Sequence, residues 1–294
     1  MLIPKVAKKV TTAQHWAGKK NILVGTDNGI NNQGESPVSQ IASNQPAKIL
    51  FFATFAQMGK IANLYLIPTT LGDTGPGNVV PATLVETVRS LRYFIVENVR
   101  TARRYLKMLD RDIDIDALEF MELNKHTDRK QLERFLYPVL NGNDTGIISE
   151  AGCPGVADPG AEVVKLAHEK DIRVIPMVGP SSILLSLMAS GMNGQNFAFV
   201  GYLPIPKGER QRAIKDLERR SANEHQTQIF IEAPYRNMKL LEDILQACHD
   251  QTRLCIAADI TLESEYIRTQ TISEWKKGVP ELHKRPAIFL LHKD

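Results

Sequence analysis

The sequence predicts an α/β protein, because short apolar runs rich in β-branched residues alternate with helical stretches from residue 64 onward. This alternation is typical of strand–helix–strand units with a mainly parallel sheet. The last predicted strands follow one another closely enough for antiparallel pairing, so we expect a mixed sheet in the second half. With 294 residues and 43% hydrophobic content, the chain is long enough for two such units.

We divide the chain into three parts where its composition changes. Residues 1–57 are expected to be a flexible extension, or a stretch translated from a misassigned start. The segment 27–44 is rich in Asn, Gly, Ser and Gln and has no apolar period, so it cannot bury enough surface to offset its ordering entropy. An N-terminal α/β domain is predicted over 58–178, and a C-terminal α/β domain over 179–294.

The individual elements follow from the same pattern, taken in chain order. Short apolar runs bounded by turn residues are predicted to be strands, at 64–67, 94–97, 118–122, 146–149, 173–178, 197–202, 228–232, 254–258, 266–270 and 287–291. The longer stretches between most of them are predicted to be helices, at 81–91, 101–109, 128–140, 160–170, 181–190, 208–220 and 237–249. Asp158, Pro159 and Ser181 are residue types that favour helix starts.

Charge and composition exclude several classes of protein. The formal net charge is +3, but residues 1–57 hold six lysines and two acidic residues, which leaves a net charge of −1 on residues 58–294. The three cysteines form no CxxC pair and the seven histidines show no ligand spacing, so we expect neither a metal site nor a disulfide framework. No apolar stretch reaches the roughly 20 residues of a membrane helix. We therefore expect a cytoplasmic protein without a membrane partner.

Four loops that follow predicted strands combine Gly, Pro, hydroxyl and acidic residues, at 68–73, 149–160, 178–182 and 230–236. Ligands of open α/β sheets bind outside the carboxyl ends of the strands, so these loops are candidate binding elements. The first is not a G-x-G-x-x-G loop, and a dinucleotide site is therefore not supported. Each loop also has a purely structural interpretation, since Asp158 and Ser181 can cap helices and Arg236 can pair with Glu232.

Taken together, these loops resemble the motifs of the tetrapyrrole methylase superfamily, the class III S-adenosylmethionine-dependent methyltransferases. Within it, the sequence is most similar to the branch of the bacterial small-subunit rRNA cytidine 2′-O-methyltransferases. The resemblance rests on LYLIPTTLGD (64–73), VENVR (96–100), SEAGCPGVADPG (149–160), VGPSS (178–182), GYLPIPKGER (201–210) and IEAPYR (231–236). It covers essentially all of residues 58–294.

The resemblance implies a two-domain fold with a cofactor cleft between the domains, S-adenosylmethionine as cofactor, and a homodimer. By position in the motifs, it implies cofactor contacts at Leu71, Gly152, Cys153, Pro154, Val156, Ser181, Ser182, Glu232, Ala233, Pro234, Pro286 and Ala287. The residues agree with this, because Gly/Pro-rich loops let backbone groups approach a ligand and a helix start suits a carboxylate.

The chain also departs from that branch, and the departures leave the substrate open. VENVR stands where the family typically has AEDTR, so Asn98 and Val99 replace Asp and Thr, and Glu150 replaces Asp in SDAG. The small C-terminal extension that is usual in the rRNA enzymes is expected to be missing. Three interpretations therefore remain: a methyltransferase of rRNA or a ribosomal subunit, a methyltransferase of a tetrapyrrole or other small molecule, and a cofactor-binding homologue without catalysis.

Transfer to a hydroxyl requires a base, and an RNA acceptor requires cations at its phosphates. Glu97, Glu150 and Glu232 stand at strand ends and are candidate bases, although each can instead be an ion-pair partner. The candidate substrate-binding residues lie in two basic stretches and are Arg100, Arg103, Arg104, Lys207 and Arg210. Such stretches are equally typical of solvated helix faces.

Overall fold

The computed structural model describes residues 62–123 and 127–294, and the predicted extension at 1–57 lies outside them. The first sheet contains β1 (Asn63–Ile67), β2 (Tyr93–Val96), β3 (Glu119–Glu122), β4 (Thr145–Ile148) and β5 (Arg173–Pro176). All of its pairings are parallel, and the strand order is β3-β2-β4-β1-β5. The carboxyl ends of β2, β4 and β1 therefore lie side by side.

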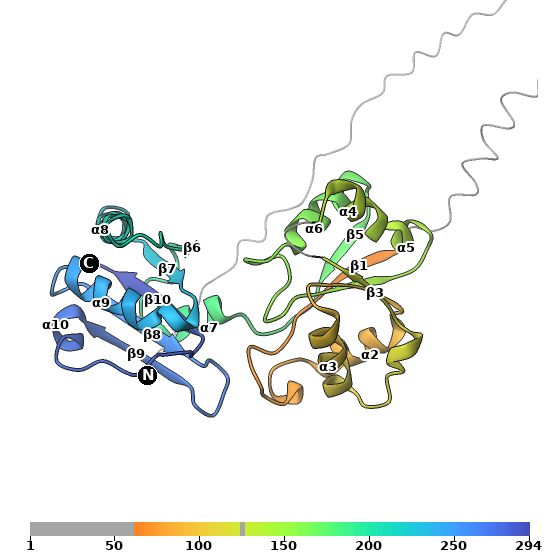
Figure 1. Ribbon diagram of the computed structural model, residues 1–294, viewed down its shortest axis with the longest axis horizontal. Helices are drawn as coiled ribbons and strands as arrows, with labels where there is room; N and C mark the ends of the chain where they lie inside the picture. Colours follow the sequence, from red (N-terminus) through yellow and green to blue (C-terminus); the bar gives the residue numbers. More distant parts are fainter. Residues whose placement is uncertain (1–61, 124–126) are drawn as a thin grey trace, which may run out of the picture. The chain divides into compact units, whose positions relative to one another are not determined.

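Helices cover both faces of this sheet (Figure 1). On one face, α2 (Ala82–Ser90) and α3 (Val99–Leu109) pack on alternate strand residues such as Phe94 and Ile148. On the other face, α4 (Arg129–Phe135) and α6 (Gly160–Glu169) pack on Leu64, Ile95 and Ile147. Because side chains alternate along a strand, β1, β2 and β4 each contribute to both cores, as expected for a buried parallel sheet.

The second sheet is mixed, with the order β6-β7-β10-β8-β9. Its strands are β6 (Phe197–Tyr202), β7 (Thr227–Ile231), β8 (Arg253–Ala258), β9 (Tyr266–Thr271) and β10 (Ala287–His292). The β6–β7 pairing is parallel, and the pairings that involve β8, β9 and β10 are antiparallel. The prediction of a mainly parallel first sheet and a mixed second sheet is thus confirmed.

Three helices enclose the second sheet, and a short one follows β9. Two of them, α8 (Lys207–Glu224) and α9 (Asn237–Ala247), pack on the face that carries Phe230 and Phe289, together with Trp275 of α10 (Ile272–Trp275). The third, α7 (Ser182–Ser190), places Leu187 on the opposite face with Ile229 and Leu290. The boundary expected at 178/179 lies between β5 and α7, and the division into two domains stays a prediction.

The structure corrects one predicted helix. Residues 128–140 form two helices, α4 and α5 (Tyr137–Leu140), rather than one. Asp128 begins α4 with a capping box that involves Gln131. Pro138 lies in the first turn of α5, where its missing N–H costs nothing, whereas inside a continuous helix its ring would clash with the preceding turn.

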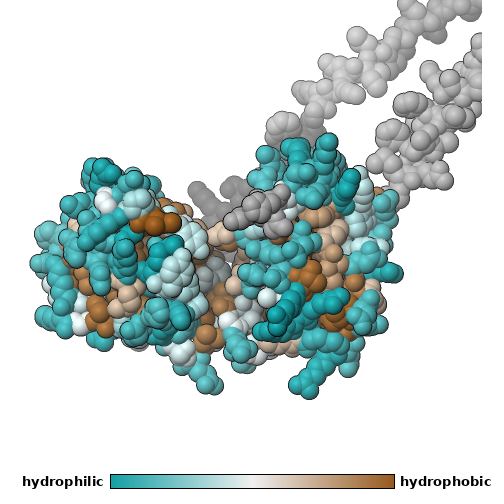
Figure 2. Space-filling model, in the orientation of Figure 1, coloured by the Kyte–Doolittle hydropathy of each residue, from teal (hydrophilic) through white to brown (hydrophobic). Residues whose placement is uncertain are grey.

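Three single-turn 3₁₀ segments complete the described elements: η1 (Pro76–Asn78), η2 (Ile115–Ala117) and η3 (Pro234–Arg236). The face in Figure 2 is mainly hydrophilic, with hydrophobic residues in scattered patches. No helix within residues 62–123 and 127–294 is long and apolar enough to cross a membrane.

Candidate functional site

The candidate site is built on loops at the carboxyl ends of β1, β2 and β4. The loop after β1 lies against the loop after β4, since the Thr69 N–H donates to the Gly152 carbonyl at 2.9 Å. Gly152 and Gly155 have positive φ angles of 70° and 81°, which glycine adopts without strain. The Gly content of the 149–160 loop thus permits a sharply turned backbone at the strand ends.

Two adjoining cavities, which we call the motif cleft, extend from these loops to the second sheet. The first has a volume of about 340 Å³, and Glu97, Cys153, Val156 and Ser181 are among its lining residues. The second, about 300 Å³, has a more apolar lining that includes Ala257 and Ile260. Both are lined by Leu71, Ala151, Ser182, Tyr202, Ile231 and Ile288. The two cavities therefore share a wall along the motif cleft.

The motif cleft brings together most of the residues predicted to contact a cofactor. Those in the first cavity are Leu71, Gly152, Cys153, Val156, Ser181 and Ser182. Those in the second are Leu71, Ser182, Glu232, Pro234, Pro286 and Ala287. Pro154 is buried and lines neither cavity. Ala233 lines a separate surface groove with Tyr202 and Ile205.

Carboxylates gather at one end of the motif cleft. Glu97 follows β2, and its Oε1 accepts a hydrogen bond of 3.4 Å from the Glu150 N–H. Asp158 Oδ1 accepts hydrogen bonds of 2.8 Å from the N–H groups of Gly155 and Gly160. Gly160 is the first residue of α6, and the N-cap position is Pro159 rather than the expected Asp158, which binds the helix start from one residue earlier. The Oδ2 of Asp158 is buried and has no partner among the described residues.

Burial changes the proton affinity of this end of the cleft. Burial and, second, the charge of Asp158 raise the pKa of Glu97. Burial also raises the pKa of Asp158 itself, against the two backbone hydrogen bonds that it accepts. Burial and the nearby Asp158 likewise raise the pKa of the Cys153 thiol. A proton is therefore held more tightly here than at an exposed carboxylate.

Glu232 occupies a different environment from the other two candidate bases. Its side chain is 1% exposed, and Oε1 accepts hydrogen bonds from Arg236 Nε at 2.9 Å and Arg236 Nη2 at 2.6 Å. The Ala233 N–H donates to the same oxygen at 2.7 Å. This arrangement favours the ion-pair role that the sequence left open, in which Glu232 and Arg236 hold the turn after β7.

The start of α7 supplies polar groups to the motif cleft. Ser181 is the N-cap residue, and its Oγ accepts a hydrogen bond from the Leu184 N–H at 3.5 Å. Ser182 is the first residue of α7 and lines both cavities. The remaining free N–H groups and the helix dipole favour a negatively charged ligand group at this point.

The predicted substrate-binding cations do not share one surface. Arg103 lies over the Phe120 ring, with 5.4 Å from its Cζ to the ring centroid. Arg100 is exposed in the first turn of α3. Lys207 is exposed, 3.9 Å from Asp243 Oδ1. Arg210 is buried and ion-paired with Asp243, so its guanidinium is not open to a substrate.

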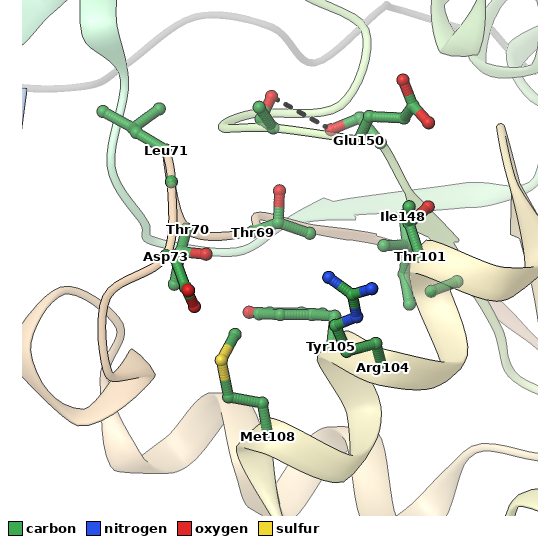
Figure 3. Close-up of a pocket in the computed structure, with 14 residues that line it drawn as sticks. Thr69, Thr70, Leu71, Asp73, Thr101, Arg104, Tyr105, Met108, Ile148 and Glu150 are labelled. Carbon is green, nitrogen blue, oxygen red and sulfur yellow. Dashed lines mark hydrogen bonds between the residues drawn. The ribbon is translucent and has the colours of Figure 1, made fainter. Parts of the chain in front are cut away.

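Arg104 instead lines a further cavity of about 260 Å³, which we call the side cavity. Figure 3 shows Arg104, from α3, and Asp73, from the loop after β1, on its walls. The side cavity shares Leu71, Glu150 and Ala151 with the motif cleft. The sequence did not single out Thr69 or Tyr105 as site residues, because they follow β1 and β2, which lie on either side of β4 only in the folded chain.

Asn98 shows how one departure from the family motif is accommodated. It is the N-cap of α3, and its Oδ1 accepts hydrogen bonds from the N–H groups of Arg100 at 2.9 Å and Thr101 at 3.2 Å. An Asn oxygen caps a helix about as well as an Asp oxygen does. The VENVR segment therefore still begins α3 at the strand end.

Among residues 62–123 and 127–294, no group of three or more His, Cys, Asp or Glu side chains is arranged to hold a metal ion. No model of a known protein family matches the chain.

Relatives with curated names cover most of the chain. It is 27% identical over 237 residues to "Ribosomal RNA small subunit methyltransferase I" of Buchnera aphidicola subsp. Schizaphis graminum, which covers 80% of this chain and 79% of that protein. It is 28% identical over 222 residues to the protein of the same name from Escherichia coli O157:H7, with coverages of 76% and 73%. The relative from Micromonospora olivasterospora is 31% identical over 202 residues, with coverages of 69% and 60%.

Solved structures share the fold at low sequence identity. The methyltransferase CobJ has a TM-score of 0.53 at 14% identity and covers 79% of this chain and 94% of its own. A uroporphyrin-III C-methyltransferase from Thermus thermophilus, complexed with S-adenosylhomocysteine, has a TM-score of 0.50 at 14% identity, with coverages of 79% and 98%. These relatives and solved structures support the tetrapyrrole methylase superfamily. The expected superfamily, fold class and methyltransferase activity are therefore confirmed.

Proposed function

We propose that this member of the tetrapyrrole methylase superfamily transfers the methyl group of S-adenosylmethionine to ribosomal RNA of the small subunit. The observation that carries the proposal is the motif cleft, whose two adjoining cavities are lined by residues from the loops after β1, β2 and β4, from α7, and from β7 and β10. The names of the relatives point to the same acceptor.

The residues of the motif cleft fit this methyl donor. The apolar second cavity, with Ala257, Ile260 and Pro286, suits a flat adenine ring. The start of α7 suits a carboxylate, and the unpartnered Asp158 Oδ2 can accept a hydrogen bond from an ammonium or hydroxyl group. When bound, the sulfonium supplies an electrophilic methyl group.

The protein's own contribution is alignment, exclusion of water and removal of one proton. We propose Glu97 as the base, because it lies at the end of β2 in the motif cleft and its raised pKa brings it closer to a working value near neutrality. Glu232 is held by Arg236. Glu150 is exposed, and its backbone N–H donates to Glu97.

Two measurements test the proposal. Calorimetry with S-adenosylhomocysteine is expected to show one site per chain, and absence of binding would contradict every methyltransferase assignment. Labelled S-adenosylmethionine is then incubated with undermethylated small ribosomal subunits and, separately, with a reduced tetrapyrrole. Label in 2′-O-methylated nucleosides supports the proposal, whereas label only in the tetrapyrrole assigns the chain to the small-molecule enzymes.

Variants separate the candidate bases. Glu97→Gln is expected to lower turnover by about a hundredfold or more, the usual contribution of general base catalysis, while the affinity for S-adenosylhomocysteine stays unchanged. Glu150→Gln, which keeps its backbone N–H, serves as the control and is expected to retain turnover. Full turnover in Glu97→Gln would remove Glu97 as the base.

We further propose that the enzyme is a cytoplasmic homodimer. An rRNA acceptor requires the compartment of the ribosome. The apolar side chains of Leu184 and Met188, one helical turn apart on α7, are exposed, as is Val178 just before it, and such a surface favours association. Light scattering after gel filtration is expected to give twice the chain mass, and Met188→Glu is expected to give the chain mass alone.

A further inference from the structure

The side cavity contains polar groups that are left without partners in the described part of the chain. Thr69 is 3% exposed, and its Oγ1 has no hydrogen-bond partner there. Figure 3 shows this oxygen turned toward the loop that carries Glu150, which lines the same cavity. Leaving a buried hydroxyl unpaired costs about 1 to 3 kcal/mol, so this side chain is suited to a ligand that completes its hydrogen bonding.

Charged groups of both signs line the same side cavity. In the described residues, neither Asp73 nor Arg104 has an ion-pair partner. Tyr105 is fixed in the lining, because its OH donates to the Pro68 carbonyl at 2.7 Å, and Met108 adds an apolar surface. The side cavity therefore offers a hydrogen-bond donor, an acceptor and apolar walls together.

This combination favours one class of ligand over others. A ligand with several carboxylates or phosphates would be repelled by Asp73 and Glu150. At about 260 Å³, the volume lies near the lower end of small-molecule pockets, roughly 300 to 1,000 Å³. A neutral, flat ring with adjacent donor and acceptor groups, such as a nucleobase, satisfies both conditions.

We propose that the side cavity holds the base of the nucleotide to be methylated, and that Asp73 and Arg104 bind the edge of a base with an exocyclic amine. The proposal rests on the function proposed above. Asp73 accepts from the amine, Arg104 donates to the adjacent ring nitrogen or carbonyl, and Thr69 completes the polar lining. Proteins read unstacked RNA bases in this way, by hydrogen bonds to their edges. The residues shared with the motif cleft place the attached ribose toward the methyl donor.

The test uses NMR of the full chain, labelled with ¹³C-methyl methionine and saturated with S-adenosylhomocysteine. It records the methyl signal of Met108, which lines the side cavity. Its signal is assigned with Met108→Leu, and cytidine and uridine 5′-monophosphates are titrated as probes that differ in one amine. We expect both to shift the Met108 signal, with the cytidine nucleotide binding about fivefold tighter, the discrimination of one good base contact.

Variants of the lining residues make the expectation specific. Thr69→Val is expected to lower the affinity for cytidine monophosphate about fivefold, because a hydrogen bond between neutral groups is lost. Arg104→Gln is expected to lower it about tenfold, because the lost hydrogen bond involves a charged group. Asp73→Asn is expected to shift the preference toward uridine monophosphate, because an amide can donate to its carbonyl. Lys107→Gln removes the same charge as Arg104→Gln from the same helix, outside the lining, and is expected to change affinity less than twofold.

The proposal is overturned if neither nucleotide moves the Met108 signal, or if Arg104→Gln and Asp73→Asn bind both nucleotides like the unaltered chain. The remaining methionine signals show whether each variant is folded. Binding of nucleotides does not require methyl transfer, so failure of the ribosomal-subunit assay with a positive titration counts against the function and not the cavity. Methylation of subunits without nucleotide binding in the side cavity supports the function and counts against the cavity.

Discussion

The buried ion pair of Arg210 and Asp243 gives the sharpest prediction about stability. The two side chains are 2% and 3% exposed, and Arg210 Nε and Nη2 donate to Asp243 Oδ2 at 2.8 and 2.5 Å. Arg210 Nη1 also donates to the Ile205 carbonyl at 2.5 Å. The pair thus ties α8 to α9 and to the segment before α8, inside the GYLPIPKGER motif.

Asp243→Ala removes the only carboxylate that Arg210 contacts among the described residues and leaves a buried, unpaired guanidinium. Breaking a buried pair from one side costs about 3 to 5 kcal/mol, a large fraction of the roughly 5 to 15 kcal/mol that stabilises a domain. The matched control is Asp216→Ala on α8, whose partner Arg219 is 2.8 Å away with exposures of 60% and 70%. An exposed pair contributes about 0 to 1 kcal/mol.

Urea unfolding followed by circular dichroism measures both variants at the same pH and salt concentration. The expected result is a large fall in the midpoint for Asp243→Ala and almost none for Asp216→Ala. The double variant Arg210→Met with Asp243→Leu is expected to recover part of the loss, because no unpaired charge remains. A loss below about 1 kcal/mol in Asp243→Ala would refute a structural role for Arg210 and reopen its role in substrate binding.

Three other predictions concern the candidate site. Thr69→Val is expected to raise the melting temperature slightly, because it removes an unpaired buried hydroxyl; a lower melting temperature would show that the hydroxyl has a partner. The raised pKa of Glu97 means that the native state binds the proton more tightly, so this group's contribution to stability falls as pH rises from its unfolded pKa through its folded one. Glu97→Gln is therefore expected to be more stable than the unaltered chain at pH 7, with a difference that shrinks toward pH 4; a constant difference would contradict this. The raised pKa of Cys153 predicts slow alkylation at pH 8, measured by mass spectrometry, and further slowing with S-adenosylhomocysteine bound; protection absent at saturating ligand would place the ligand elsewhere.

Much of the fold could be predicted from local patterns. Alternation of short apolar runs with helical stretches is a property of neighbouring residues, and it indicated the strands of both sheets. Local signals failed where one residue changed a continuous pattern, as Pro138 did in dividing the expected helix 128–140 into α4 and α5. The motif loops were recognisable because Gly, Pro and acidic residues at strand ends are also local features.

The roles of the charged residues could not be predicted, because each role depends on a partner distant in sequence. Arg210 and Lys207 looked alike in one basic stretch, yet only Arg210 is buried against Asp243. Glu97 and Glu232 both directly follow strands, but Glu97 lies near Asp158 with a raised pKa, whereas Glu232 is ion-paired with Arg236. Burial and Coulomb interactions act through space, so residue type alone does not set them.

The sequence by itself determined that this chain forms strand–helix units and carries loops that resemble those of a tetrapyrrole methylase. Backbone preference and motif spacing depend only on residues that are close together in the sequence. Only the tertiary structure decided which acidic and basic groups face the motif cleft and which are paired and buried. The physical reason is the parallel order β2-β4-β1. It brings together strand ends that are far apart in sequence, and a group's protonation and availability depend on those neighbours.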